Sequence, residues 1–311
     1  ELEHRVGAKL KKVSKYLAGR RSTWTGGGQK VAVIHAEGTI VSGKGGPGLL
    51  GGQMIGSDSM SKLIKKVRED DDIVAVVLRV NSPGGSGMAS DAIWRELMLT
   101  QDKKPIVVSM GDYAASGGYY IAMGADHIVA QPGTITGSIG VFGGKLNLSG
   151  LKSQIGLSTH SFERGARADL LSSEEDFDPE DRKKFRQFLN GFYKTFVRKA
   201  ANGRGMSIEA MEAVAKGRVW TGEQALAHGL VDRLGGLQEA IDTAQSLASV
   251  EEPLGIVRFP ERKGFMDQLL DEIANPEPVA HMAAPAMQLT SAAGLREALS
   301  AAITLDQILA D

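Results

Sequence analysis

The sequence contains no cysteine. A disulfide, a thiolate nucleophile and a cysteine-ligated zinc site are therefore excluded. Without cysteine, the composition is equally compatible with an oxidising and a reducing compartment. No H-E-x-x-H motif and no clustered carboxylate pattern is present, so we predict neither a metal nor another cofactor.

The sequence also lacks an excess of either charge. Lys and Arg number 36 and Asp and Glu number 37, which gives a formal net charge of -1. Without a basic excess we predict no nucleic-acid partner. No apolar run approaches the roughly 18 residues of a membrane span, and the N-terminus has neither an initiator Met nor a signal-peptide pattern. We therefore expect a fragment, or a matured product, of a longer protein.

Composition and periodicity divide the chain into three regions. Residues 1–29 carry a basic amphipathic stretch and end in "TGGGQ", which is typical of a linker or of the end of a preceding domain. Residues 30–248 alternate β-rich and helical runs. Residues 249–311 are rich in Ala, Met and Pro and contain two weak helical patterns, "FMDQLLDEIA" and "GLREALSAAI". We expect this last region to be a helical tail.

The middle region has the pattern of an α/β domain. The runs "IVAVVLRV" and "PIVVSM" are almost wholly apolar and β-branched, as expected of strands covered on both faces by helices. Alternating strands and helices predict a parallel sheet with crossover helices. After this pattern, "DPEDRKKFRQFLNGFYKTFVRKAANGRG" predicts a long helix, and its Phe residues at three-to-four spacing predict a packing surface.

Two neighbouring strands of this pattern end in glycine-rich turns. "NSPGGSG" follows one strand, and "GDYAASGGYY" follows the next, with Ser116 placed directly before Gly117. In parallel α/β sheets, reactive groups gather at the carboxyl ends of strands, where helix N-termini offer free N–H groups. The pattern indicates a nucleophilic serine, Ser116, facing an oxyanion hole formed by the main-chain N–H groups of Gly85 and Gly117.

Four motifs carry a resemblance to a known family. "VLRVNSPGGS", "KKPIVVSMGDYAASGGYYIA", "PGTITGSIGVFG" and "GRVWTGEQALAHGLVDRLGG" occur in the order found in the signal peptide peptidase A family of serine peptidases. The resemblance covers about residues 30–248. It implies a fold related to the Clp protease and crotonase.

The resemblance also assigns roles to residues and predicts partners. It implies Ser116 as nucleophile, Gly85 as an oxyanion donor, and Ser138 as a residue that positions a lysine general base. Implied substrates are cleaved signal peptides and other apolar peptides at the membrane, on its extracytoplasmic (periplasmic) face. Implied assemblies are rings or domes of several copies.

The chain departs from the family pattern at the lysine. Single-domain members carry it in a G-x-x-K-D context about fifty residues after the serine, but residues 165–169 read "GARAD" and place Ala168 there. Three explanations stay open. The chain is an inactive variant, or Lys145 or Lys152 acts instead, or the chain is the C-terminal half of the two-repeat form, whose lysine comes from the other half. We favour the third explanation and expect the isolated chain to be inactive or weak.

Other functions compete with this interpretation. A histidine could act as base, but His127, at the start of a predicted strand, is more typical of a structural residue. The chain could instead be a catalytically silent half that completes a ring-shaped peptidase. A crotonase-like acyl-CoA enzyme is a further alternative, because that fold also builds an oxyanion hole from paired glycines.

Overall fold

The computed structural model describes residues 28–48, 53–252 and 254–260, which belong to one compact unit ending at Pro260. The predicted linker, apart from its last two residues, and most of the predicted tail lie outside these residues. The described part of the tail contributes a strand, β11 (Gly255–Phe259), that pairs with β1 (Lys30–Glu37). Among the described residues, no helix is both long and apolar enough to cross a bilayer.

An eight-stranded sheet forms the centre of the unit. Its main path has the order β10-β7-β6-β5-β1-β11, with every neighbouring pair parallel, and β8 and β9 extend it beside β6. The further strands of this sheet are β5 (Ile73–Ser82), β6 (Ile106–Ala115), β7 (His127–Ala130), β8 (Ile135–Gly137), β9 (Val219–Thr221) and β10 (Arg233–Leu234). The predicted α/β architecture with a mostly parallel sheet is confirmed.

A small second sheet lies near the ends of these strands. It has the order β2-β4-β3 and is built from β2 (Thr39–Val41), β3 (Gly45–Pro47) and β4 (Gln53–Gly56). An isolated bridge between Ile40 and Gly85 joins β2 to the turn that follows β5. This sheet therefore supports the glycine-rich turn from one side.

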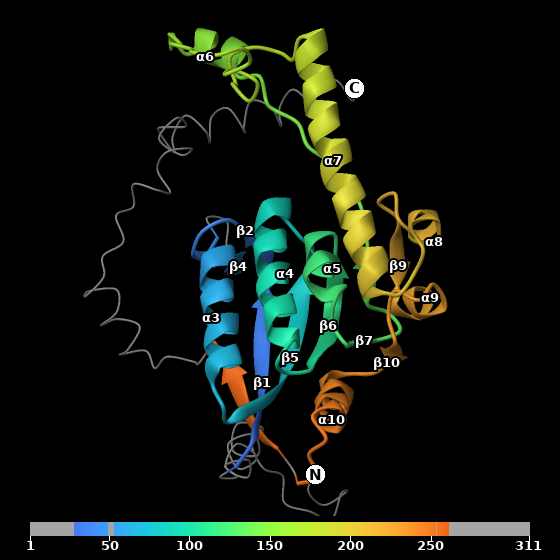
Figure 1. Cartoon of the computed structure of the whole chain (residues 1–311). Helices are drawn as coiled ribbons and strands as arrows, with labels where there is room; N and C mark the ends of the chain where they lie inside the picture. The colour runs from blue at the N-terminus through green and yellow to red at the C-terminus, as the bar shows by residue number, and fades with distance from the viewer. Residues whose placement is uncertain (1–27, 49–52, 253, 261–311) are drawn as a thin grey trace, which may run out of the picture. The chain divides into compact units, whose positions relative to one another are not determined.

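Helices cover both faces of the large sheet (Figure 1). Helices α3 (Ser57–Glu69), α4 (Gly87–Gln101) and α5 (Gly117–Ala122) lie over one face, and α10 (Leu237–Leu247) packs on the other. Alternate apolar residues of β5 accordingly face opposite sides of the sheet and belong to two separate core clusters. Burial on both faces explains the continuous apolar runs in the sequence.

The long helix α7 (Pro179–Gly203) begins at a capping box in which Asp178 and Asp181 bond each other's main-chain N–H. Its C-terminal half packs in the core, where Phe196 is 1% exposed, whereas Phe188 in the N-terminal half is 60% exposed. The predicted aromatic packing surface therefore holds for the second half of the helix. The remaining helices are α6 (Ser149–Gln154), α8 (Ile208–Val214) and α9 (Gly222–Ala227).

Residues 142–178, which we call the arm, connect β8 to α7 and contain α6. Figure 1 shows α6 beside the N-terminal end of α7, away from the large sheet. Large apolar side chains are exposed along the arm, and Phe142 and Phe162 are 95% and 99% exposed. No residue of the arm, all of which the structure describes, is fully buried.

Candidate active site

Ser116 lies at a sharp turn from strand β6 into helix α5. The strand runs to Ala115, further than the predicted end near Met110, and Ser116 is the N-cap of α5 with φ 52° and ψ -118°. A non-glycine residue with positive φ costs on the order of 1–3 kcal/mol and is frequent at functional sites. The surrounding backbone therefore holds Ser116 in a strained conformation at the end of the sheet.

The glycine turn after β5 packs directly against this serine. Gly84 and Gly85 have φ of 104° and 147°. A Cβ on Gly84 would lie 2.9 Å from the Ser116 Cβ, and a Cβ on Gly85 would lie 2.1 Å from the main-chain oxygen of Ile40. A Cβ on Gly117 would lie 3.2 Å from the Gly85 nitrogen. The two strand ends meet backbone to backbone, which only glycine permits.

Two main-chain N–H groups at this meeting point have no hydrogen-bond acceptor among the described residues. Beside Gly85, Ile40 N–H donates to Gly84 O and Ser86 N–H donates to Ile40 O, each at 2.8 Å. The N–H groups of Gly85 and Gly117 donate no hydrogen bond to another described residue, and Gly117 is the first residue of α5, where helical N–H groups are free. Such donors can stabilise an oxyanion next to the serine.

Ser138 follows the neighbouring strand and lies next to Ser116. Strand β8 pairs with β6 so that Gly137 is opposite Ala115, and Ser116 N–H donates to Gly137 O at 2.9 Å. Ser138 also has positive φ, at 49°. Both serines are partly exposed, and neither hydroxyl hydrogen-bonds to a residue in the described ranges. The structure thus brings Ser116, Ser138, Gly85 and Gly117 together, while their chemical roles stay predictions.

Two buried tyrosines hold α5 in place behind the serine. The Tyr119 hydroxyl donates to Leu230 O at 3.0 Å, and the Tyr120 hydroxyl donates to Asp91 on α4. Burial raises the pKa of both tyrosines, so both keep their protons and remain donors. Asp91 also pairs with Lys199 of α7. Helices α4 and α7 are thereby tied to the short helix that begins at Ser116.

Ala168 lies far from the serine of its own chain. It is exposed and follows Arg167, which pairs with Asp178 and Asp181 at the start of α7. Further along the helix, the Phe192 ring lies against the start of α4, where it would be 2.3 Å from a Cβ on Gly87. The stretch from 178 to 192 spans about 21 Å at 1.5 Å per residue. A lysine at position 168 could not reach Ser116 of the same polypeptide.

The other candidate lysines are engaged elsewhere. Lys145 Nζ lies 4.6 Å from the centre of the Phe177 ring, and Lys152 pairs with Glu174 and holds the pKa of that carboxyl below its usual value. Both lysines belong to the arm. Burial lowers the pKa of Lys104, as a lysine base requires, but Lys104 precedes the first residue of β6 whereas Ser116 follows its last. The partner strand β5 covers the stretch from Ile106 to Ala114 with six residue steps, Val76 to Ser82, so the two ends lie about 20 Å apart.

The described histidines make no contact with the Ser116 hydroxyl. His127 lies at the start of β7, where its Nε2 is buried without a partner among the described residues, and His35 lies 3.2 Å from Glu37. His228 packs 4.2 Å from the Trp220 ring. No hydrogen bond connects a histidine in the described part of the chain to either serine.

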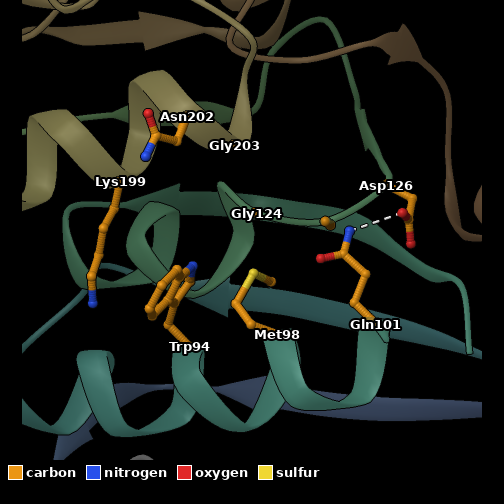
Figure 2. A pocket seen from close by; sticks show the side chains of 9 residues that line it. Trp94, Met98, Gln101, Gly124, Asp126, Lys199, Asn202 and Gly203 are labelled. Carbon is orange, nitrogen blue, oxygen red and sulfur yellow. Dashed lines mark hydrogen bonds between the residues drawn. The ribbon is translucent and has the colours of Figure 1, made fainter. Parts of the chain in front are cut away.

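A pocket at the C-terminal end of α5 is separate from these residues. Figure 2 shows Trp94, Met98 and Gln101 of α4 on one side and Lys199 and Asn202 of α7 on the other. None of the predicted site residues lines it. The strained serine and the free N–H groups are at the opposite, N-terminal end of α5.

Comparison with known proteins agrees with the motifs. Residues 98–251 match peptidase family S49. A Synechocystis sp. protein named as a protease is 36% identical over 240 residues, which cover 74% of this chain and 82% of that protein. The chain belongs to peptidase family S49. The resemblance to signal peptide peptidase A is thereby confirmed.

Longer S49 relatives are also similar to this chain. The chloroplastic serine protease SPPA of Arabidopsis thaliana is 43% identical over 227 residues, which are 73% of this chain and 33% of that protein. Protease 4 of Salmonella typhi is 38% identical over 79% of this chain and 39% of its own length. The chain therefore spans only about a third to two fifths of these relatives.

Proposed function

We propose that this chain is the serine-bearing part of a Ser-Lys endopeptidase. The observation that carries the proposal is the strained Ser116 at the strand end, packed against a glycine turn and flanked by two unpaired N–H groups. Strand-to-helix turns of this kind expose a nucleophile beside an oxyanion hole. A fold related to the Clp protease and crotonase is part of the same proposal.

The reaction is an acyl transfer. The Ser116 hydroxyl attacks a peptide carbonyl while a neutral lysine amine removes its proton, and the N–H groups of Gly85 and Gly117 hold the resulting oxyanion. As the intermediate collapses, the lysine ammonium returns the proton to the leaving amine. Water then attacks the acyl-enzyme with the lysine again as base, which releases the second product and restores Ser116. Ser138, beside Ser116, positions the lysine.

The lysine comes from another polypeptide segment, either a homologous half or another subunit. Ala168 offers no amine, and the Ser116 hydroxyl has no hydrogen-bond partner among the described residues, which is consistent with a base that arrives from outside the chain. The exposed apolar side chains of the arm support a contact with such a partner, because large exposed patches mark interaction surfaces. We propose that the arm packs on a neighbouring copy or half in a ring-shaped or dome-shaped assembly.

The substrates are apolar peptides such as the remnants of signal peptides, on the extracytoplasmic face of a membrane. Tyr113, Ile135 and Val219 are exposed on three neighbouring strands next to the serine. They offer an apolar surface on which an extended peptide could lie against the sheet. The alternative is a silent half that only completes the assembly, which the alanine at position 168 favours.

Labelling by a fluorophosphonate probe tests the proposal. We expect Ser116 of the full-length protein to be labelled and Ser116→Ala to remain unlabelled. The isolated chain should label only after the lysine-bearing half is added. Absence of labelling at Ser116 in the full-length protein would support the silent half instead.

A further inference from the structure

Strands β5 and β6 lose their regular pairing just before the site. Val80 is opposite Met110, but the next pair is Ser82 with Ala114. One residue of β5, Asn81, therefore faces three residues of β6, Gly111, Asp112 and Tyr113. This bulge inserts two extra residues into β6.

The bulge decides where Ser116 lies. With the register of Val80 and Met110 continued, Ser116 would be level with Ser86, whereas the register after the bulge puts it level with Gly84. This agrees with the 2.9 Å between the Ser116 Cβ and a Cβ built on Gly84. Two residues of strand correspond to about 7 Å. Since the insertion is even, the alternation of side chains between the two faces is kept.

Asn81 is the residue that holds the bulge. Its side-chain oxygen accepts hydrogen bonds from Asp112 N–H at 3.2 Å and from Tyr113 N–H at 3.3 Å. Neither Asp112 nor Tyr113 has a partner in the register of β5 with β6, so the amide oxygen takes the place of a main-chain acceptor on β5. The side chain also lies flat against Gly111, where a Cβ would be 3.0 Å from the same oxygen.

Neighbouring groups fix the same segment from outside. Gly111 O accepts a hydrogen bond from the Thr134 hydroxyl at 2.8 Å, and Asn81 O accepts one from Gly38 N–H at 3.0 Å. The side-chain nitrogen of Asn81 has no hydrogen bond to another described residue. Only the oxygen of this side chain is therefore used.

We infer that Asn81 is a positioning residue of the peptidase: it fixes a two-residue bulge that brings Ser116 level with the Gly84–Gly85 turn. This inference rests on the proposed function of Ser116. Asn81 touches no reacting atom. Its effect passes through Asp112 and Tyr113 to the serine three residues further on.

Three variants separate the acceptor oxygen from the bulk of the side chain. Asn81→Ala removes both, Asn81→Leu keeps a similar bulk without an acceptor, and Asn81→Asp keeps an oxygen in the same place. Asn202→Ala, on α7, is the matched control. The first measurement is hydrogen exchange of the amides of 112 and 113 in the chain itself. We expect about 10-fold or faster exchange in Asn81→Ala and near wild-type exchange in Asn81→Asp and the control.

The second measurement is the rate of fluorophosphonate labelling in the full-length protein. We expect a loss of about 10- to 100-fold in Asn81→Ala, because a small displacement of a reacting group has such effects. Asn81→Asp should recover most of the rate, and Asn81→Leu should stay as slow as Asn81→Ala, which a purely steric role of asparagine would not explain. Equal labelling of Asn81→Ala, Asn81→Leu and the control, or unchanged exchange in Asn81→Ala, would overturn the inference. A wild type that never labels would overturn the proposed function, and the exchange result would still decide whether Asn81 holds the bulge.

Discussion

The two halves of helix α7 belong to regions of opposite construction. Its C-terminal half packs on α5, behind the serine, in a core where Phe196 is 1% exposed. Its N-terminal half meets the arm, where Phe162 is 99% exposed. Packing in the first region holds helix α5, and with it the backbone around Ser116, in place. The second leaves large apolar side chains exposed in the segment that contains Ala168. In the proposed function, the first region supplies the serine and the oxyanion hole, and the second contacts the partner that brings the lysine.

The largest effect is expected from removing the hydroxyl at the sheet end. Ser116→Ala should lower peptide hydrolysis by the full-length protein by about 10⁴-fold or more, since no other hydroxyl can form the acyl-enzyme. Ser138→Ala should lower it less, because the proposed role of Ser138 is to position the lysine. Initial rates with a fluorogenic apolar peptide measure both, and equal losses would assign Ser138 a larger role than positioning.

The glycine turn offers the next largest effect. Gly85→Ala places a Cβ 2.1 Å from Ile40 O at a positive φ, which should shift the N–H that holds the oxyanion. We expect kcat to fall by about 10²- to 10³-fold. Gly133→Ala is the control, because a Cβ there meets nothing within 4 Å. An active Gly85→Ala enzyme would remove this turn from the oxyanion hole.

Two phenylalanines test the comparison between core and arm directly. Phe196→Ala should lower the free energy of unfolding by about 3–5 kcal/mol because it opens a cavity in the core. Phe162→Ala should change it by less than about 0.5 kcal/mol, yet weaken association with the lysine-bearing partner. Urea unfolding and analytical ultracentrifugation give the two quantities. A destabilised Phe162→Ala chain would show that the arm packs on its own domain.

The smallest effect concerns the ion pair inside the arm. Lys152 lowers the pKa of Glu174 from its ordinary value of 4.5. A carboxyl with a lowered pKa in the folded state contributes stability above its unfolded pKa and loses it as the pH falls through the folded pKa. The stability of the arm, measured by hydrogen exchange, should therefore fall only below about pH 4.5. Glu174→Gln should remove this loss of stability at low pH. A loss of stability at low pH that persists in Glu174→Gln would belong to another carboxyl.

Much of the fold follows from local sequence. The apolar runs of β5 and β6 need two covered faces, and the acidic turn at Asp178 with Pro179 fixes the start of α7. The glycine pairs mark close backbone approach, so Ser116, Gly85 and Gly117 could be selected from the sequence. The same motif contains Asn81, but a bulge depends on pairing between strands, so nothing local reveals that its oxygen serves two N–H groups of β6. The exposure of the arm is likewise a tertiary property, because its apolar residues have the spacing of ordinary core residues.

The central claim, that Ser116 needs an amine from another polypeptide, is tested most directly by complementation between copies. One chain keeps Ser116 and Ala168, and the other carries Ser116→Ala together with Ala168→Lys. Neither should hydrolyse a fluorogenic peptide alone, and their mixture should gain turnover that grows with the concentration of the lysine-bearing variant. Robust turnover by the first chain alone, unchanged by the second, would contradict the account.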